Sequence, residues 1–316
     1  MGRYVGQRLV LAILQIFLVA TLVFAFLRLL PGDPVLVILG GDRTPQPEQV
    51  EAVRRELGLD HSLPEQYASW MVRLVRLDLG RSLVDGEPVQ RGIAERLPRT
   101  LELVFVAAGL ATLVAIPMGV VAALSRNRAP DWLLSATATL GISVPGYVTG
   151  MLLVLVFGVL LRWLPTQGYV DVLDSPPDHL LRLIMPAAVL AFGLGATITR
   201  MTRSSVLEVL HQDYVRTARA KGLGERTVLS RHVLRNSLIS VVTIIGVQVG
   251  TLIGGTVIVE YIFNWPGLST MLVTAINRRD YPTVQGVVLV SSTFLILMNL
   301  AVDLLYGYLD ARIRYS

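Results

Sequence analysis

The chain has no cysteine, and lysine occurs once, as Lys221. Without cysteine there is no disulfide framework, no thiolate metal site and no cysteine nucleophile. The four histidines are scattered and have no metal-ligand spacing; they are His61, His179, His211 and His232. We therefore expect no metal site and no cofactor held by this chain.

Charged residues are also scarce, at 16% of 316 positions, whereas hydrophobic residues make up 53%. A soluble domain carries about 25% charged residues, so this chain is short of polar surface for a water-exposed body. Long apolar runs alternate with short charged stretches, a pattern typical of a chain that threads a bilayer. The formal charge of +5 comes almost wholly from arginine. Such an excess orients a membrane protein, and with no aromatic residues interleaved it does not indicate nucleic-acid binding.

Motifs for catalysis are missing as well. A Walker A loop requires a lysine followed by Ser or Thr, but Lys221 is followed by Gly222. There is no Gly-x-Ser-x-Gly elbow, and no paired acid and base lies inside an apolar run. We therefore predict that the chain is not an enzyme, has no catalytic residue and does not hydrolyse ATP itself.

Six stretches are apolar enough to cross a membrane, which takes about 20 residues. They are 9–30, 101–124, 132–161, 184–201, 238–262 and 284–309. The third contains Pro145-Gly146, which predicts a kink or a break, and the fourth is short and follows Pro186. The sequence thus predicts an all-α membrane protein with six transmembrane helices. Residues 1–30 form an uncleaved signal anchor, 31–98 an extracytoplasmic insert, and 99–316 a core with five transmembrane helices.

Arginine in the short loops predicts the orientation. With six spans, four arginine-bearing segments fall on one side, which must be the cytoplasm. They carry Arg3 and Arg8; Arg126 and Arg128; the basic residues of 202–237; and Arg312 and Arg314. Both termini are therefore expected in the cytoplasm. Segment 31–98 falls outside, because its acids roughly balance its arginines and long segments cross largely regardless of charge.

Segment 31–98 contains two stretches with apolar residues at helical spacing. Val50, Val53 and Leu57 follow Pro47, and Tyr67, Trp70, Met71, Leu74 and Leu77 follow Pro64. A small helical cap is expected there. It is either a packing insert between the first two spans or a landing surface for an external partner.

Segment 202–237 reads as two short amphipathic helices joined at a glycine turn. Val206, Leu207, Val209, Leu210, Tyr214 and Val215 form the first apolar stripe, and Val228, Leu229, Val233 and Leu234 the second. Gly222 or Gly224 can adopt the left-handed conformation that ends a helix. Ala218 and Ala220 leave little side chain in the way of a close partner. The segment is therefore either a docking element or an amphipathic stretch on the anionic inner leaflet.

Polar and small residues inside the spans mark further candidates. Glu260, Asp303, Arg200 and Arg28 lie near span ends, where snorkelling makes a charge inexpensive. Gln248, Gln285 and Asn299 lie deeper and either line a pathway or bond between helices. Gly246, Gly250 and Gly254 form a ridge that predicts close packing of the fifth span.

Several motifs resemble a known family. The run 213–223 (DYVRTARAKGL), with 231–236 (RHVLRN) downstream, resembles the cytoplasmic loop of bacterial ABC importer permeases. It is most similar to the dipeptide/oligopeptide/nickel permease family, first-permease branch. Segments 29–34, 265–268 and 279–282 agree with that branch, and the resemblance covers essentially the whole chain. One departure is that Arg216 and Thr217 stand where the general importer loop has Glu and Ala.

The resemblance implies that the loop contains a cytoplasmic coupling helix that sits in a groove of an ATPase. Its candidate residues are Tyr214, Arg216, Thr217, Ala218, Arg219, Ala220, Lys221, Gly222 and Leu223. Residues 265–268 are expected to form a rigid turn at the outer mouth, because Trp prefers the membrane interface and Pro-Gly favours a tight turn. Candidates for the outer gate or translocation path are Gln248, Glu260, Trp265, Pro266, Gly267 and Asp280.

The resemblance also implies the partners and the setting. The chain would work with a homologous second permease, two cytoplasmic ATPase subunits that use ATP and Mg, and an extracytoplasmic substrate-binding protein. It would do so among the lipids of the bacterial cytoplasmic (inner) membrane. The implied substrates are di- and oligopeptides, with glutathione and nickel chelates less common. The alternative class is a secondary transporter driven by an ion gradient, against which the missing internal repeat and central acid argue.

Overall fold

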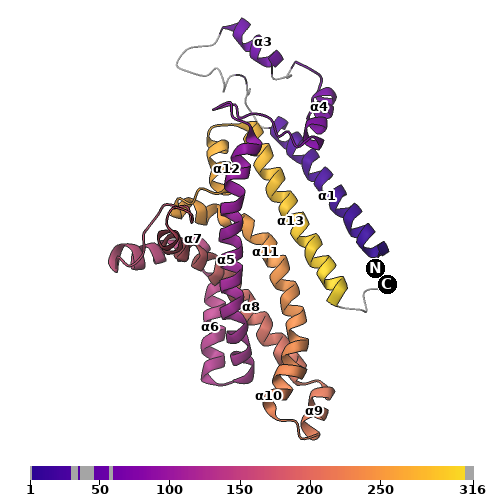
Figure 1. Cartoon of the computed structure of the whole chain (residues 1–316), viewed down its shortest axis with the longest axis vertical. Coiled ribbons are helices and arrows are strands. Elements are labelled where there is room, and N and C mark those ends of the chain that lie inside the picture. The colour runs from indigo at the N-terminus through magenta and orange to yellow at the C-terminus, as the bar shows by residue number, and fades with distance from the viewer. Residues whose placement is uncertain (1, 30–34, 36–45, 57–59, 310–316) are drawn as a thin grey trace. The chain divides into compact units, whose positions relative to one another are not determined.

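The computed structural model describes residues 2–29, 35, 46–56 and 60–309, and helices account for nearly all of them (Figure 1). Within these residues, five helices are long and apolar enough to cross a membrane: α1 (Gly2–Leu29), α5 (Val89–Leu124), α8 (Pro176–Leu210), α11 (Arg235–Phe263) and α13 (Tyr281–Leu309). A bent pair of shorter helices brings the number to six if its two arms are counted as one span. Among the described residues the only β pairing is an isolated bridge between Arg81 and Pro88. The predicted all-α membrane fold is confirmed.

The bent pair is α6 (Ala129–Ser143) followed by α7 (Gly146–Leu153) and the π-helix η1 (Val154–Leu160), at an angle of 105°. Val144 is extended (φ −83°, ψ 121°) and precedes Pro145. Proline has no N–H to donate and disfavours a helical residue before it, so the first helix ends there. The break predicted at Pro145-Gly146 is confirmed.

Two helices are longer than the apolar runs that predict them. The fourth span, expected at 184–201, lies within the 35-residue helix α8, which continues through Pro186. Helix α5 begins at Val89, although its apolar run begins at 101. Hydropathy detects only the part of a helix that matches the bilayer, so polar turns at either end escape it.

The chain divides into two compact units. The first comprises Met1–Leu9, Thr100–Trp265 and Leu297–Ser316; the second comprises Val10–Arg99 and Pro266–Ile296. Helices α1, α5 and α13 each contribute residues to both units. Each unit is described below by itself.

In the second unit, α3 (Pro47–Glu56) and α4 (Leu63–Val75) are the two helices predicted after Pro47 and Pro64. Helix α4 packs on α1 through Tyr67 and Trp70, whose rings lie 5.3 and 5.5 Å from that of Phe24. At its start the backbone N–H of Ser62 donates to the carboxylate of Glu65 (3.0 Å). Hydrogen bonds from Ser62 lower the pKa of Glu65. Helix α12 (Leu268–Asn277) packs through Leu268 against the first turns of α5 and α13.

In the first unit, α8 packs against α6 and α11, and glycines permit its closest approaches to α5 and α6. A Cβ on Gly119 of α5 would lie 2.7 Å from the carbonyl oxygen of Thr199. A Cβ on Gly141 of α6 would lie 2.7 Å from the Cβ atom of Ala196. Arg203 of α8 also makes a bidentate ion pair with Asp131 of α6, at 2.6 and 2.8 Å. This core holds the end of α8 from which the candidate coupling helix departs.

Candidate functional site

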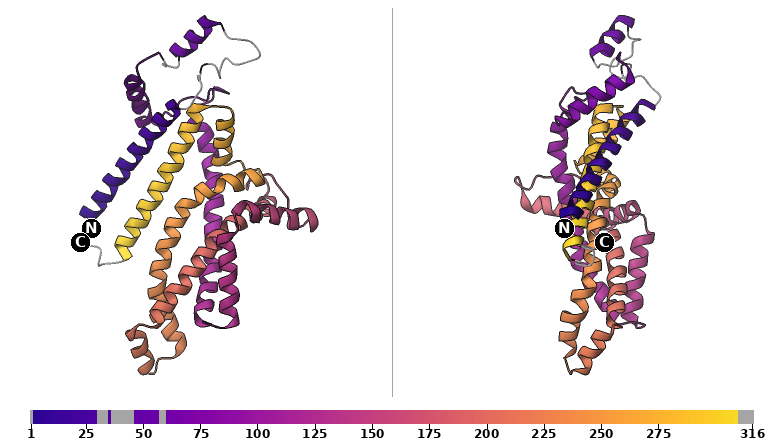
Figure 2. Two further views of the ribbon diagram at one scale, coloured as in Figure 1. Left: turned by 180° about the vertical axis from the view of Figure 1, so that it is seen from behind. Right: turned by 90° about the vertical axis from the view of Figure 1, so that its right-hand side faces the viewer.

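The candidate coupling helix is α9 (Asp213–Ala220), which lies where α8 ends and the next long helix begins, at one end of the first unit (Figures 1 and 2). Gln212 precedes it in an extended conformation, and Asp213 occupies its first turn, where the helix dipole favours an acid. The following helical segment comprises α10 (Glu225–Thr227), the π-helix η2 (Val228–Leu234) and α11. Two helices joined by a turn are thus present, as the sequence predicts.

The turn after α9 depends on Gly222, which has φ +81°. The N–H groups of Lys221 and Leu223 donate to the carbonyls of Thr217 and Ala218, at 3.0 and 3.3 Å. Glycine adopts positive φ without steric cost, which explains its place here. Of the two glycines that the sequence left open, Gly224 has φ −62° and precedes α10.

The inward face of α9 is apolar. Val215 is fully buried and Ala218 is 5% exposed. Both belong to a cluster with Ala123, Val206, Val228 and Val233. The two stripes predicted in 202–237 therefore pack together. The expectation that the Ala218 side chain faces a partner is wrong, because this chain's own core surrounds it.

The outward face of α9 and its turn is polar and positively charged. The exposed coupling candidates are Tyr214, Arg216, Thr217, Arg219, Ala220, Lys221, Gly222 and Leu223. Arg219 pairs with Glu225 across the turn, and the hydroxyl of Tyr214 accepts a hydrogen bond from Asn236 (3.1 Å). Both contacts tie α9 to the segment that leads into α11, so the element is stiff while its outer surface stays accessible.

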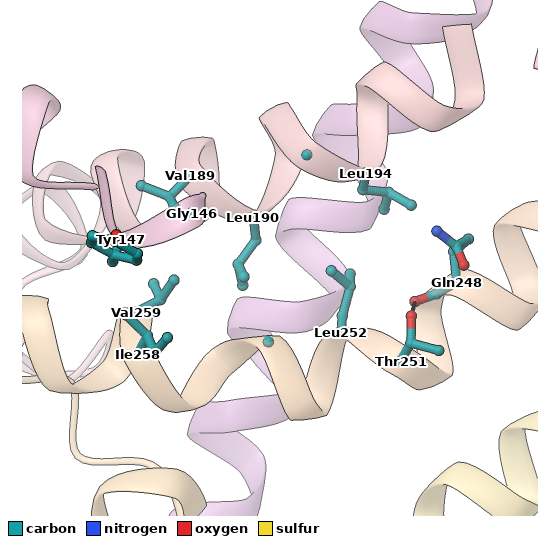
Figure 3. Close-up of a pocket in the computed structure, with 12 residues that line it drawn as sticks. Gly146, Tyr147, Val189, Leu190, Leu194, Gln248, Thr251, Leu252, Ile258 and Val259 are labelled. Carbon is teal, nitrogen blue, oxygen red and sulfur yellow. Dashed lines mark hydrogen bonds between the residues drawn. The ribbon is translucent and has the colours of Figure 1, made fainter. Parts of the chain in front are cut away.

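A groove lies between α7, α8 and α11 in the same unit (Figure 3). Its volume is about 310 Å³. Figure 3 shows Gln248 and Thr251 near one end and Tyr147 near the other, with aliphatic side chains between them. The hydroxyl of Thr251 donates to the backbone carbonyl of Gln248, and the Gln248 side chain itself lines the groove. Gln248 is thus the one pathway candidate that lines this groove.

Glu260 and Trp265 lie in the same unit and are both fully buried. The carboxylate of Glu260 accepts a hydrogen bond from Thr100 of α5 (2.7 Å). The indole of Trp265 packs edge-on against Tyr169 (4.8 Å) and lies 5.9 Å from the ring of His179. Neither side chain is an exposed anchor at a membrane surface. Trp265 is therefore packed inside this unit, where Tyr169 and His179 are among its neighbours.

The remaining gate candidates, Pro266, Gly267 and Asp280, belong to the second unit. Asp280 is 5% exposed and ties three groups together. Its carboxylate accepts hydrogen bonds from the hydroxyl of Ser82 (2.6 Å), the N–H of Leu83 (3.0 Å) and the hydroxyl of Thr283 (2.7 Å). It therefore fixes the loop before α5 to the start of α13, and it has little exposed surface to offer a solute.

The sequence gives no sign of the pair formed by His179 and Glu102. Nε2 of His179 lies 2.7 Å from Oε1 of Glu102, and Nδ1 lies 2.7 Å from the carbonyl oxygen of Val170. A carbonyl only accepts, so Nδ1 carries a proton. The contact between Nε2 and the Glu102 oxygen then needs one more proton, which lies on either Nε2 or the Glu102 carboxyl group. Tertiary packing creates this pair from residues 77 positions apart.

The glycine ridge predicted on the fifth span is only partly a packing surface. A Cβ on Gly246 would lie 2.3 Å from Cγ2 of Val302 on α13, whereas one on Gly254 would meet nothing within 4 Å. No group of three or more metal-ligating side chains occurs within the residues that the structure describes.

Comparison with known proteins identifies the family. Residues 115–315 match the model of the binding-protein-dependent transport system inner membrane component, and residues 1–104 match the N-terminal model of the same system. This chain is therefore a permease subunit of an ABC importer. It belongs to the family of binding-protein-dependent transport system inner membrane components.

Similar proteins span the whole chain. A putative peptide transport system permease protein of Brucella abortus is 46% identical over 310 residues, which are 98% of each chain. The glutathione transport system permease protein of Escherichia coli O6:H1 is 43% identical over 316 residues, covering both chains completely. Among solved structures, inward-facing MetNI methionine ABC transporter has a TM-score of 0.58 at 16% identity over 71% of this chain and 99% of that one. That likeness supports the fold alone.

Proposed function

We propose that this permease forms one half of the pathway through which an importer moves di- or oligopeptides, and that it belongs to the first-permease branch. Relatives over 40% identical along the full length carry peptide and glutathione transport names, which supports a peptide-like solute. The other half is a homologous permease. An extracytoplasmic binding protein delivers the solute, and two cytoplasmic ATPases use ATP and Mg.

The groove beside Gln248 supports a pathway role for the face formed by α7, α8 and α11. It is concave and its walls are mostly apolar, with an amide and a hydroxyl near one end and a second hydroxyl near the other. Apolar walls can accommodate varied side chains of a peptide, and the polar groups can form hydrogen bonds with its backbone, as in many ligand sites.

The two different faces of α9 are the main support for a role in coupling to the ATPase. Its inner face is packed into the unit, whereas its outer face is exposed and basic. A rigid-body movement of an ATPase needs such a stiff contact to reach the membrane helices. We place the chain in the bacterial inner membrane, with α9 and both termini on the cytoplasmic side.

Cysteine labelling tests this orientation, because the chain has no cysteine of its own. Gln212 and Ser62 are both exposed and accept a single cysteine each. A membrane-impermeant maleimide added to intact cells should label position 62 and leave position 212 unlabelled until the membrane is opened. Labelling of position 212 in intact cells would overturn the proposed orientation.

Reconstituted complexes test the substrate. The purified permease pair and its ATPases are reconstituted in liposomes with α9 and ATP on the inside. The binding protein and labelled dipeptide are added outside, and the liposomes should accumulate the dipeptide. A matched preparation with glutathione distinguishes the two substrate classes. Accumulation of neither solute, with ATP hydrolysis unaffected by the binding protein, would contradict the proposal.

A further inference from the structure

A second cavity lies beside α9, on the first unit. Its volume is about 200 Å³, and it is bounded by the ends of α5 and α8 together with α9, α10 and η2. Five of its lining residues are apolar: Leu124, Leu210, Val228, Leu229 and Val233. The other three are charged: Arg219, Glu225 and Arg226. A lining that combines apolar and charged side chains suits an amphiphile.

Two of the three charged residues at this cavity form an ion pair with each other, and the third does not. Arg219 and Glu225 neutralise each other at 2.7 Å. Arg226 is exposed, and its guanidinium has no hydrogen bond or ion pair to any residue that the structure describes. Arg126 and Arg128, which follow the wall residue Leu124 closely, are likewise exposed and unpaired in the described part of the chain. The net charge available to a ligand is therefore positive.

The position of Leu124 indicates where such a ligand comes from. Leu124 is the last residue of the membrane-spanning helix α5 and is 50% exposed. Leu124 also ends the apolar stretch 101–124 that the sequence predicts as a span, so the surface of the bilayer is expected near this end of the cavity. An acyl chain can enter from the bilayer while a phosphate stays beside the guanidinium, which forms charge-assisted hydrogen bonds with phosphate oxygens.

We propose that this cavity binds one anionic phospholipid, with an acyl chain against Leu124 and Leu229 and the phosphate on Arg226. The lipid then lies beside the turn that follows α9, where Arg219 pairs with Glu225. The assignment to the inner leaflet rests on the orientation proposed above. The binding itself rests only on the cavity and its charges.

Native mass spectrometry of the full chain in detergent measures this binding, with phosphatidylglycerol and phosphatidylcholine added separately. Arg226→Gln is the test variant. Arg231→Gln is its control, since Arg231 is also exposed, lies five residues further along and does not line the cavity. Arg226→Gln should weaken phosphatidylglycerol retention about fivefold, the usual worth of one arginine at an anionic surface, and Arg231→Gln should leave it near wild type.

A second pair of variants tests the apolar wall. Leu124→Trp places a large ring at the cavity and should also reduce phosphatidylglycerol retention. Leu110→Trp puts the same ring at an exposed site on the same helix, away from the cavity, and should have no effect.

Three results would overturn the proposal. Equal retention of the two lipids would remove the role of charge, and equal losses in both arginine variants would indicate general surface attraction. Unchanged lipid retention in Arg226→Gln together with lost ATPase co-purification would assign the cavity to a protein partner. The lipid measurement needs neither ATPase nor transport, so it stands apart from the cysteine labelling that tests the proposed function.

Discussion

The guanidinium of Arg219 closes on the carboxylate of Glu225, with Nε 2.7 Å from Oε1 and Nη2 3.3 Å from Oε2. The pair spans the turn at Gly222 and joins the end of α9 to the start of the next helix. Exposed ion pairs of this kind contribute about 0–1 kcal/mol to stability, so its importance must lie in holding the turn or in meeting a partner.

Arg219→Gln and Glu225→Gln separate these two roles. Both remove the pair, and both should leave the melting temperature of the permease within a few degrees of wild type, since little stability is lost. If Arg219 meets the ATPase directly, Arg219→Gln should reduce ATPase co-purification more than Glu225→Gln. Equal losses would show that the pair acts by shaping the turn.

Gly222→Val should impair coupling through backbone strain. The residue has φ +81°, and a Cβ there would meet nothing within 4 Å, so added volume is not the cause of any defect. A β-branched residue in this conformation costs about 1–3 kcal/mol. Gly222→Asn is the control, because asparagine tolerates the left-handed region. ATP hydrolysis stimulated by the binding protein should fall in the valine variant and stay close to wild type in the asparagine variant.

Tryptophan at positions 218 and 220 should give two different defects. Ala218 is buried in this chain's own core, so Ala218→Trp should lower the unfolding free energy of the permease by about 1–3 kcal/mol through overpacking. Ala220 is exposed, so Ala220→Trp should leave the melting temperature unchanged and reduce ATPase binding. Thermal unfolding in detergent, run beside ATPase co-purification, distinguishes them. Full ATPase binding by Ala220→Trp would remove this face of α9 from the interface.

Trp265→Ala should destabilise the permease rather than act on uptake alone. The indole is fully buried against Tyr169 and His179, and truncation of such a ring typically costs about 3–5 kcal/mol. Tyr261→Ala is a matched control, since Tyr261 lies one turn earlier and is 70% exposed. A normal melting temperature for Trp265→Ala would contradict the packing described here.

Gly119→Ala should destabilise the contact between α5 and α8. The new Cβ would lie 2.7 Å from the carbonyl oxygen of Thr199, a backbone atom that a side-chain rotation cannot move away. We expect a loss of about 1–3 kcal/mol, measured as a lower melting temperature in detergent. Gly109→Ala, on the same helix with nothing within 4 Å, should be neutral or slightly stabilising. Equal behaviour of the two variants would exclude close packing at Gly119.

The sequence predicts the helices well because each prediction depends on local chemistry. Apolar runs locate the spans, Pro145 locates the break, and the paired stripes of 202–237 indicate two helices that pack together. Helix ends are predicted less well, since polar turns such as those before residue 101 carry no hydropathy signal.

Side-chain environments at the site could not be predicted in the same way. Ala218 and Ala220 look alike in the sequence, yet one is buried and the other exposed, because α9 presents only one face to the core. Trp265 is typical of a membrane interface by residue type alone, but neighbours distant in sequence cover it. The pairing of His179 with Glu102 arises only when α8 and α5 pack together.

Helices α10, η2 and α11 form one continuous helical rod, Glu225–Phe263, of 39 residues. At 1.5 Å per residue, 39 helical residues follow about 58 Å of helix axis, which is enough to cross a bilayer and continue beyond it. The rod begins at the residue that Arg219 holds, and Phe263 at its far end accepts a hydrogen bond from Gly168 (2.9 Å). A movement of α9 would therefore reach the segment around Gly168 through a single helix that has no break between Glu225 and Phe263.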